Sequence, residues 1–166
     1  GFCLVGSEMC IRDSRYTELV SQEIVQKVEC PILLDADALR LRVIEVAQKR
    51  NSNYGRVVLT PHMGEFLRIA KITKLDDPNN TLLRFCSFNH VITVLKGPVT
   101  RVCDGESILY NTQGGPVLSR GGSGDILAGL IGAMIAQNNT CVSTAVSRGL
   151  MLHGLAAQEL AREKGQ

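Results

Sequence analysis

No stretch of the 166-residue sequence is apolar over the roughly 20 residues that a membrane-spanning helix needs. The sequence also has no basic run interleaved with aromatic residues, and its net charge is only +2. These absences leave no reason to propose a nucleic-acid or membrane partner. The six cysteines form no CxxC pair and have no pair of histidines nearby. We therefore expect reduced, mostly buried thiols in a cytoplasmic protein, rather than disulfides or a zinc site.

The chain also lacks an initiating methionine. Residues 1–14 begin with Gly1 and show neither the basic region nor the cleavage pattern of a secretory signal. We interpret them as translated adapter sequence, that is, a non-native leader. A genuine strand followed by a turn at Asp13-Ser14 is the alternative. Residues 15–166 contain no internal repeat or low-complexity segment, which predicts one domain or a part of one.

From Arg15 onward, short apolar strands alternate with segments of helical period. The expected strands are 32–34, 56–59 and 91–95, with a hairpin of strands 101–103 and 107–110 around Asp104-Gly105. The expected helices are 17–29, 38–50, 65–70, 78–87 and 143–162, with one more directly after the glycine-rich loop 121–125. This order predicts an α/β fold whose mostly parallel sheet is covered on both faces. Ligands of such sheets bind beyond the carboxyl ends of the strands.

The glycine-rich loop is the most informative segment. The backbone N–H groups of Gly122, Ser123 and Gly124 precede a helix, where a glycine-rich turn and the helix dipole favour an anion. Asp125 follows directly, and a carboxylate in an anion site makes sense as a general base that takes a proton from the group to be phosphorylated. The alternative is that Asp125 only caps the helix.

The turns after the predicted strands carry further candidates. Lys96 begins a turn that ends at Thr100 and offers a cation, a glycine and a hydroxyl to a phosphate, although a solvated surface turn fits as well. His62 contacts a ligand or caps the helix that begins near Glu65. Asp35 and Asp37 share a face if the chain stays extended there, and they are weak candidates for Mg²⁺ ligands.

For Asp37 we favour a cap on the helix expected at Ala38. His153, in the apolar last helix, is expected to be packed rather than catalytic.

Four motifs together resemble a known family. They are Leu-Asp-Ala-Asp-Ala-Leu at 34–39, Leu-Thr-Pro-His-Met-Gly-Glu-Phe at 59–66, Val-Leu-Lys-Gly-Pro-Val-Thr at 94–100 and Gly-Gly-Ser-Gly-Asp-Ile-Leu-Ala-Gly at 121–129. In this order they resemble the ADP/ATP-dependent NAD(P)H-hydrate dehydratases of the ribokinase-like superfamily. The resemblance implies a three-layer α/β/α fold and a repair reaction. In that reaction the 6-hydroxyl of hydrated NADH or NADPH is phosphorylated from ADP or ATP, and loss of phosphate regenerates the reduced cofactor.

The resemblance also implies roles for individual residues. His62 and Asp125 would contact the hydrated dinucleotide, with Asp125 as the base. The adenine nucleotide would contact Lys96, Gly97, Pro98, Val99, Thr100 and Gly124. The Thr-Pro-His motif is more similar to the ADP-using bacterial branch than to the ATP-using one. Mg²⁺, a homo-oligomer, and an epimerase that is fused or separate are further expectations.

This sequence departs from the family pattern in three ways. Met63 stands where the bacterial pattern usually has proline, and Ser123 where it usually has threonine. Nothing corresponds to the N-terminal half of the family, so we expect the chain to be a C-terminal portion. Such a portion would expose apolar surface and an open sheet edge, and would be poorly active alone. A ribokinase-like small-molecule kinase and a non-catalytic nucleotide-binding module remain the alternative functions.

Overall fold

The computed structural model describes residues 14–137 and 140–163, so part of the predicted leader lies outside the described residues. Its sheet has five strands in the order β1-β2-β3-β4-β5. The first three strands are parallel, and the last two are antiparallel to their neighbours. Their bounds are Ile32–Leu34, Val57–Leu59, Val91–Leu95, Thr100–Cys103 and Ile108–Asn111. The sheet is therefore mixed: the predicted parallel part is confirmed, and the hairpin is the antiparallel part.

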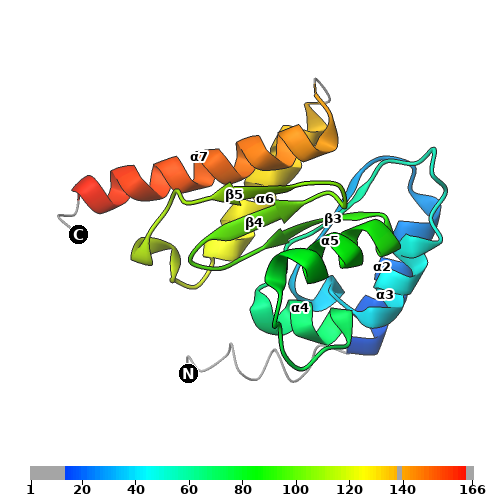
Figure 1. The fold of residues 1–166 in the computed structure, drawn as a ribbon. Helices are drawn as coiled ribbons and strands as arrows, with labels where there is room; N and C mark the ends of the chain where they lie inside the picture. The colour runs from blue at the N-terminus through cyan, green and yellow to red at the C-terminus, as the bar shows by residue number, and fades with distance from the viewer. Residues whose placement is uncertain (1–13, 138–139, 164–166) are drawn as a thin grey trace, which may run out of the picture.

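Helices cover both faces of this sheet, as Figure 1 shows. One face carries α2 (Ser14–Lys27), α3 (Leu41–Gln48), α4 (Met63–Ala70) and α5 (Pro78–Asn89), and the other carries α6 (Ser123–Ala136) and α7 (Val142–Glu163). Strand residues alternate between the faces, because successive side chains of a strand point to opposite sides. In β2, Val57 and Leu59 join the core under α3 to α5, whereas Val58 joins the core under α6 and α7. The predicted three-layer α/β/α architecture is confirmed.

The helix predicted over 38–50 begins later than expected. After β1 the backbone of Ala36 has a φ of 50°, and residues Ala36–Ala38 form a single 3₁₀ turn. The helix α3 therefore starts at Leu41, with Arg40 as its N-cap residue. The prediction that Asp37 caps a helix starting at Ala38 is wrong, because this residue lies inside the 3₁₀ turn.

The helix predicted over 17–29 is displaced toward the N-terminus and ends at Lys27. The chain leaves the helix ahead of Pro31, which disfavours helical backbone in the residue before it.

Local capping explains the boundaries of α5. The side chain of Asp77 accepts a hydrogen bond from the Asn80 N–H at 3.1 Å, and Pro78 occupies the first helical position, where it needs no N–H partner. The helix runs two residues beyond the predicted end at 87 and stops at His90, whose φ of 56° leaves the helical region.

The hairpin is confirmed at its predicted position. Asp104 accepts hydrogen bonds from the N–H groups of Glu106 and Ser107. Although partial burial raises the pKa of the Asp104 carboxyl, these hydrogen bonds outweigh it and lower the pKa below its usual value.

The cysteines are less buried than predicted. Among the described residues, Cys86 and Cys103 are buried, whereas Cys30 and Cys141 are exposed, and all four thiols are free. The absence of disulfides at these positions agrees with the prediction, but the expectation of mostly buried thiols is wrong for half of them. Cys30 and Cys141 lie in connections at the ends of α2 and α7 rather than in the core. None of the described helices is both long and apolar enough to cross a membrane.

One side of α2 carries apolar residues that the described part of the chain leaves uncovered. Val25 is fully buried, whereas Leu19, Val20 and Ile24 are exposed. The adjacent strand β1 lies at an edge of the sheet and pairs only with β2 among the described strands. The expected exposed apolar surface and open edge are both present.

Candidate active site

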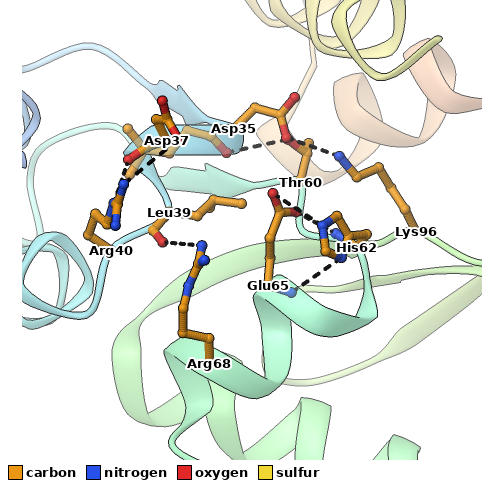
Figure 2. A network of polar contacts seen from close by, with 10 residues as sticks. Asp35, Asp37, Leu39, Arg40, Thr60, His62, Glu65, Arg68 and Lys96 are labelled. Carbon is orange, nitrogen blue, oxygen red and sulfur yellow. Dashed lines mark hydrogen bonds and ion pairs between the residues drawn. The ribbon is translucent and has the colours of Figure 1, made fainter. Parts of the chain in front are cut away.

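Three strand ends meet at one edge of the sheet. Because β1, β2 and β3 are parallel, the segments that carry Asp35, His62 and Lys96 leave the sheet at the same edge. His62 and Lys96 form an isolated parallel bridge, and the Lys96 N–H donates to the Pro61 carbonyl at 2.8 Å. Figure 2 shows these side chains together with Thr60 and Glu65. The predicted convergence of the strand-end motifs is therefore confirmed by the geometry.

The ammonium of Lys96 is held by the carboxylate of Asp35. The distance from Nζ to Oδ1 is 3.1 Å, and the two side chains are only 24% and 15% exposed (Figure 2). A Cβ placed on Gly124 would lie 3.7 Å from Lys96 Nζ and 4.0 Å from Asp35 Oδ2. The ion pair therefore faces the first turn of α6. Because residue 124 is glycine, no side chain occupies the space between the ion pair and this turn.

His62 caps α4. Its Nδ1 accepts a hydrogen bond from the Glu65 N–H at 3.3 Å, and Glu65 Oε2 accepts one from the His62 N–H at 2.8 Å. This reciprocal pair is a capping box, in which two otherwise unpaired N–H groups are satisfied. The capping alternative from the sequence is thus confirmed. The His62 side chain is still 61% exposed, so the imidazole stays accessible to a ligand while it caps the helix.

The glycine-rich loop enters α6 through a left-handed residue. Gly122 is the N-cap residue of α6, with a φ of 83°, a conformation that glycine adopts without steric cost. The N–H of Ser123 donates to the Arg120 carbonyl at 3.3 Å, so in this structure it is turned back into the loop. Gly124 is the second residue of the helix, where a backbone N–H has no intrahelical acceptor. The anion hole predicted from three N–H groups therefore has one donor already engaged.

Asp125 is exposed on the first turn of α6. The N-cap position belongs to Gly122, so Asp125 is not the capping residue. Within the described residues its carboxylate has no hydrogen-bond or ion-pair partner. A carboxylate in the first turn is favoured by the helix dipole, and this one remains open to whatever approaches the edge of the sheet.

A cavity of about 630 Å³ lies beside the strand ends and the loop. It is lined by several predicted residues, namely His62, Lys96, Gly97, Pro98, Thr100, Ser123 and Gly124. It is also lined by residues of β5, of the segment that follows it, and of α6 and α7, namely Asn111, Gln113, Gly115, Pro116, Leu118, Ser119, Leu127, Leu150, His153 and Gly154. Val99, Gly122 and Asp125 are not part of its lining. The structure thus brings most of the predicted nucleotide-contacting residues together and leaves the predicted base outside.

A sequence profile of the family described as NAD(P)H-hydrate dehydratase matches residues 13–166. The chain belongs to the NAD(P)H-hydrate dehydratase family. An ADP-dependent (S)-NAD(P)H-hydrate dehydratase of Cenarchaeum symbiosum is 30% identical over 161 residues, which cover 94% of this chain and 54% of that protein. A bifunctional NAD(P)H-hydrate repair enzyme of Moorella thermoacetica is 32% identical, and the match covers 93% of this chain and 29% of that protein. The chain spans about half or less of these curated relatives.

A solved structure leads to the same family. The ADP/ATP-dependent NAD(P)H-hydrate dehydratase of Bacillus subtilis, co-crystallised with ATP and Mg²⁺, superposes with a TM-score of 0.72 at 30% identity. The superposition covers 85% of this chain and 50% of that one. A ribokinase-like protein of Enterococcus faecalis superposes with a TM-score of 0.63 at 22% identity. At this identity the superposition supports a similar fold only. The ribokinase-like fold expected from the motifs is confirmed.

The carboxylates do not form a metal cluster of their own. Among the described residues, no group of three or more His, Cys, Asp or Glu side chains is placed to hold a metal ion. Asp35 and Asp37 do not share a face, because the 3₁₀ turn separates them; Asp37 lies 3.8 Å from Arg40 instead. Asp35 keeps one oxygen toward the head of α6. A single carboxylate oxygen is enough as a protein ligand for Mg²⁺ bound to a nucleotide, because phosphate oxygens and water supply the other ligands of this ion.

Sequence reasoning missed the contribution of α7 to the cavity. His153 is packed, as predicted, with only 8% exposure, but it also lines the cavity and lies near Ser123. Burial lowers the pKa of His153, and a hydrogen bond with the Ser123 backbone opposes this shift in part. The sequence offered one indication of this role, a histidine in an otherwise apolar helix. It did not indicate that Ser123 is the partner of His153.

Proposed function

We propose that the protein containing this chain is a nucleotide-dependent NAD(P)H-hydrate dehydratase that acts in metabolite repair. The observation that carries the proposal is the meeting of Lys96, His62 and the head of α6 around one cavity in a chain of this family. A lysine and a helix N-terminus attract phosphate from two sides. The relatives named as NAD(P)H-hydrate dehydratases support the choice of substrate.

The nucleotide occupies the cavity in this proposal. The strand-end turn supplies Lys96, Gly97, Pro98 and Thr100, and α6 supplies Gly124. Val99 lies on the same turn but outside the lining, so its contact with the nucleotide stays a prediction. The paired carboxylate of Asp35 keeps the ammonium of Lys96 near Gly124, so less ordering is needed when phosphate binds.

The dinucleotide approaches from the side of Asp125. This carboxylate takes the proton of the 6-hydroxyl while that oxygen attacks the terminal phosphorus of the nucleotide, and the bond to the departing nucleotide breaks. The C6–O bond of the new phosphate ester then breaks and inorganic phosphate leaves. The neighbouring ring carbon gives its proton to the departing phosphate, and the ring double bond is restored. Mg²⁺ bound with the nucleotide would neutralise phosphate charge, with Asp35 as the carboxylate of this chain nearest to it.

ADP is the proposed donor. The Thr-Pro-His motif supports this choice, and two relatives carry the name ADP-dependent (S)-NAD(P)H-hydrate dehydratase. The Bacillus subtilis relative was crystallised with ATP and Mg²⁺. We therefore expect both nucleotides to bind, with ADP giving the faster turnover.

The 166 residues alone should bind nucleotide better than they catalyse. Asp125 lies outside the cavity, and the chain spans only 54% and 49% of two ADP-dependent relatives. The exposed apolar side of α2 and the edge strand β1 are where the remaining sheet would pack. We propose further that the whole protein is a homo-oligomer and acts with an epimerase, fused or separate, on the same hydrated cofactor.

The test is a comparison of products. The protein that contains this chain is expressed at full length and incubated with hydrated NADPH and ADP. Recovery of the near-ultraviolet absorbance of NADPH together with release of inorganic phosphate is expected. A stable phosphoester of a small molecule, without recovery of NADPH, would establish the kinase alternative. Binding of ADP without turnover of either kind would establish the nucleotide-binding module.

A further inference from the structure

The loop between Gly121 and Asp125 makes few contacts of its own. A Cβ placed on Gly121 or Gly122 would have nothing within 4 Å. The histidine of α7 reaches the loop: His153 Nε2 lies 3.4 Å from Ser123 Oγ, and the ring also forms a hydrogen bond with the Ser123 backbone. This contact links the loop to α7.

The helix α7 is held where it can make this contact. A Cβ on Gly149 would lie 2.9 Å from the Ile131 backbone in α6, and a Cβ on Gly154 would lie 2.6 Å from Gln113 Cβ and 3.0 Å from its backbone. The shortest distance at each position, 2.9 Å for Gly149 and 2.6 Å for Gly154, is one that real Cβ atoms essentially never show. Glycine therefore permits this close approach at the two positions. His153 lies between these two contacts in sequence, and its ring therefore has little freedom to withdraw from Ser123.

The chemistry of the ring suits this role. Burial lowers the pKa of His153, so the imidazole is neutral near neutral pH. The neutral ring adds no second positive charge to the cavity that Lys96 lines. One ring nitrogen donates a hydrogen bond and the other accepts one. His153 and Ser123 both line the cavity that contains Lys96 and Gly124.

We propose that His153 is a positioning residue for the phosphate loop. It holds Ser123, and with it the first turn of α6, so that the Ser123 hydroxyl and the Gly124 N–H face the phosphate groups of the nucleotide. The proposal rests on the proposed function, because it assigns the nucleotide to this cavity. It adds that α7, through one buried histidine, sets nucleotide affinity in the cavity that Lys96 also lines.

The test uses the 166-residue chain and ADP, with affinity measured by calorimetry. His153→Leu, which keeps bulk but removes both nitrogens, is expected to weaken ADP binding about 10-fold, the equivalent of one hydrogen bond. His153→Gln, whose amide reaches the position of Nε2, is expected to retain affinity within about 3-fold. Gly132→Ala serves as a neutral control, since its Cβ would meet nothing within 4 Å.

The route through Ser123 is tested by a double-mutant cycle. Ser123→Ala alone should weaken ADP binding at least as much as His153→Leu, because it removes the hydroxyl that faces the phosphate as well as its contact with His153. The double variant should then bind ADP about as well as Ser123→Ala alone, because the contact is already lost. Additive losses, or a His153→Gln protein as weak as His153→Leu, would overturn the proposal. Where His153→Leu lowers folding yield, the comparison of wild type, His153→Gln and Ser123→Ala still tests the contact.

A spectroscopic measurement separates this proposal from the proposed function. The imidazole signals of His153 are followed by NMR in the free chain. His90 serves as an exposed reference, since it directly precedes β3 and Lys96 follows the other end of that strand. Ser123→Ala should shift the His153 signals and leave those of His90 in place; unchanged His153 signals contradict the positioning contact. Failure of the wild-type chain to bind ADP would count against the proposed function instead, and the imidazole signals would still decide the contact.

Discussion

Two aspartates beside the head of α6 differ in almost every physical respect. Asp35 is mostly buried and bonds to Lys96 at 3.1 Å. Asp125 is exposed, lies outside the cavity, and has no partner among the described residues. The first carboxylate forms an ion pair with Lys96, whereas the second is open to solvent. Two like charges near one anion site can therefore serve different purposes, because their surroundings differ.

The contrast extends to the two sides of the site. The strand-end side is built from backbone bridges, a capping box and an ion pair, so its geometry exists before a ligand arrives. The side around Asp125 is open. In the proposed function, the first side binds the phosphate groups of the nucleotide and the second receives the hydrated dinucleotide. The following predictions sharpen or break this comparison.

The largest effect is expected for Asp125→Asn in the complete protein. Turnover of hydrated NADPH should fall about 10²- to 10⁴-fold, the usual contribution of a general base. Affinity for ADP and the free energy of unfolding should change little, because the side chain has no partner to lose. Steady-state kinetics with ADP titration measures both. Asp76→Asn, an exposed loop substitution, is the matched control, and an Asp125→Asn protein with full turnover would remove Asp125 as the base.

The next effect is expected for Lys96→Met. ADP binding should weaken about 10- to 100-fold, since a phosphate contact is lost. The free energy of unfolding should fall by about 1–3 kcal/mol, because the Asp35 carboxylate is left mostly buried without its cation. Denaturation with urea and calorimetry with ADP measure the two quantities. The double variant with Asp35→Asn should regain stability but not affinity; regained affinity would show that Lys96 does not contact phosphate.

A smaller effect is expected for His62→Ala. Loss of the capping hydrogen bond should lower the free energy of unfolding by about 1 kcal/mol. His62→Asn should restore most of that loss, because asparagine is a good N-cap residue. Thermal unfolding of the three proteins gives the comparison. Equal stability of His62→Ala and the unmutated chain would mean that the capping box contributes little.

The smallest effect is the dependence of stability on pH. Burial lowers the pKa of His153 in the folded chain, whereas the unfolded chain protonates near the usual value of about 6.5. As the pH falls below that value, the unfolded state takes up more protons and stability decreases until the folded imidazole also titrates. Urea midpoints at about pH 7.5 and 5.5 measure the slope, and His153→Gln should reduce it. An equal slope in both proteins would assign the effect to other groups.

Several features of this site were predictable because they depend on neighbouring residues. Short apolar strands ending in Asp35, His62 and Lys96 predicted a parallel sheet with its ligands at one edge, and the pairing of β1 to β3 confirms this. Asp104-Gly105 predicted the hairpin. Local signals failed where a single dihedral angle redirected the chain: the positive φ of Ala36 separated Asp37 from Asp35 and delayed α3 to Leu41.

The sequence by itself determined the order of strands and helices, the glycine-rich entry to α6 and the family of the chain. Apolar period, turn residues and short motifs act over a few positions, so they can be interpreted without coordinates. Only the tertiary structure decided which side chains meet. Lys96 and Asp35 are 61 residues apart, and Ser123 and His153 are 30 apart. The first contact depends on which strands lie in one sheet, since Asp35 follows β1 and Lys96 follows β3. The second depends on how closely α7 packs, which Gly149 and Gly154 permit.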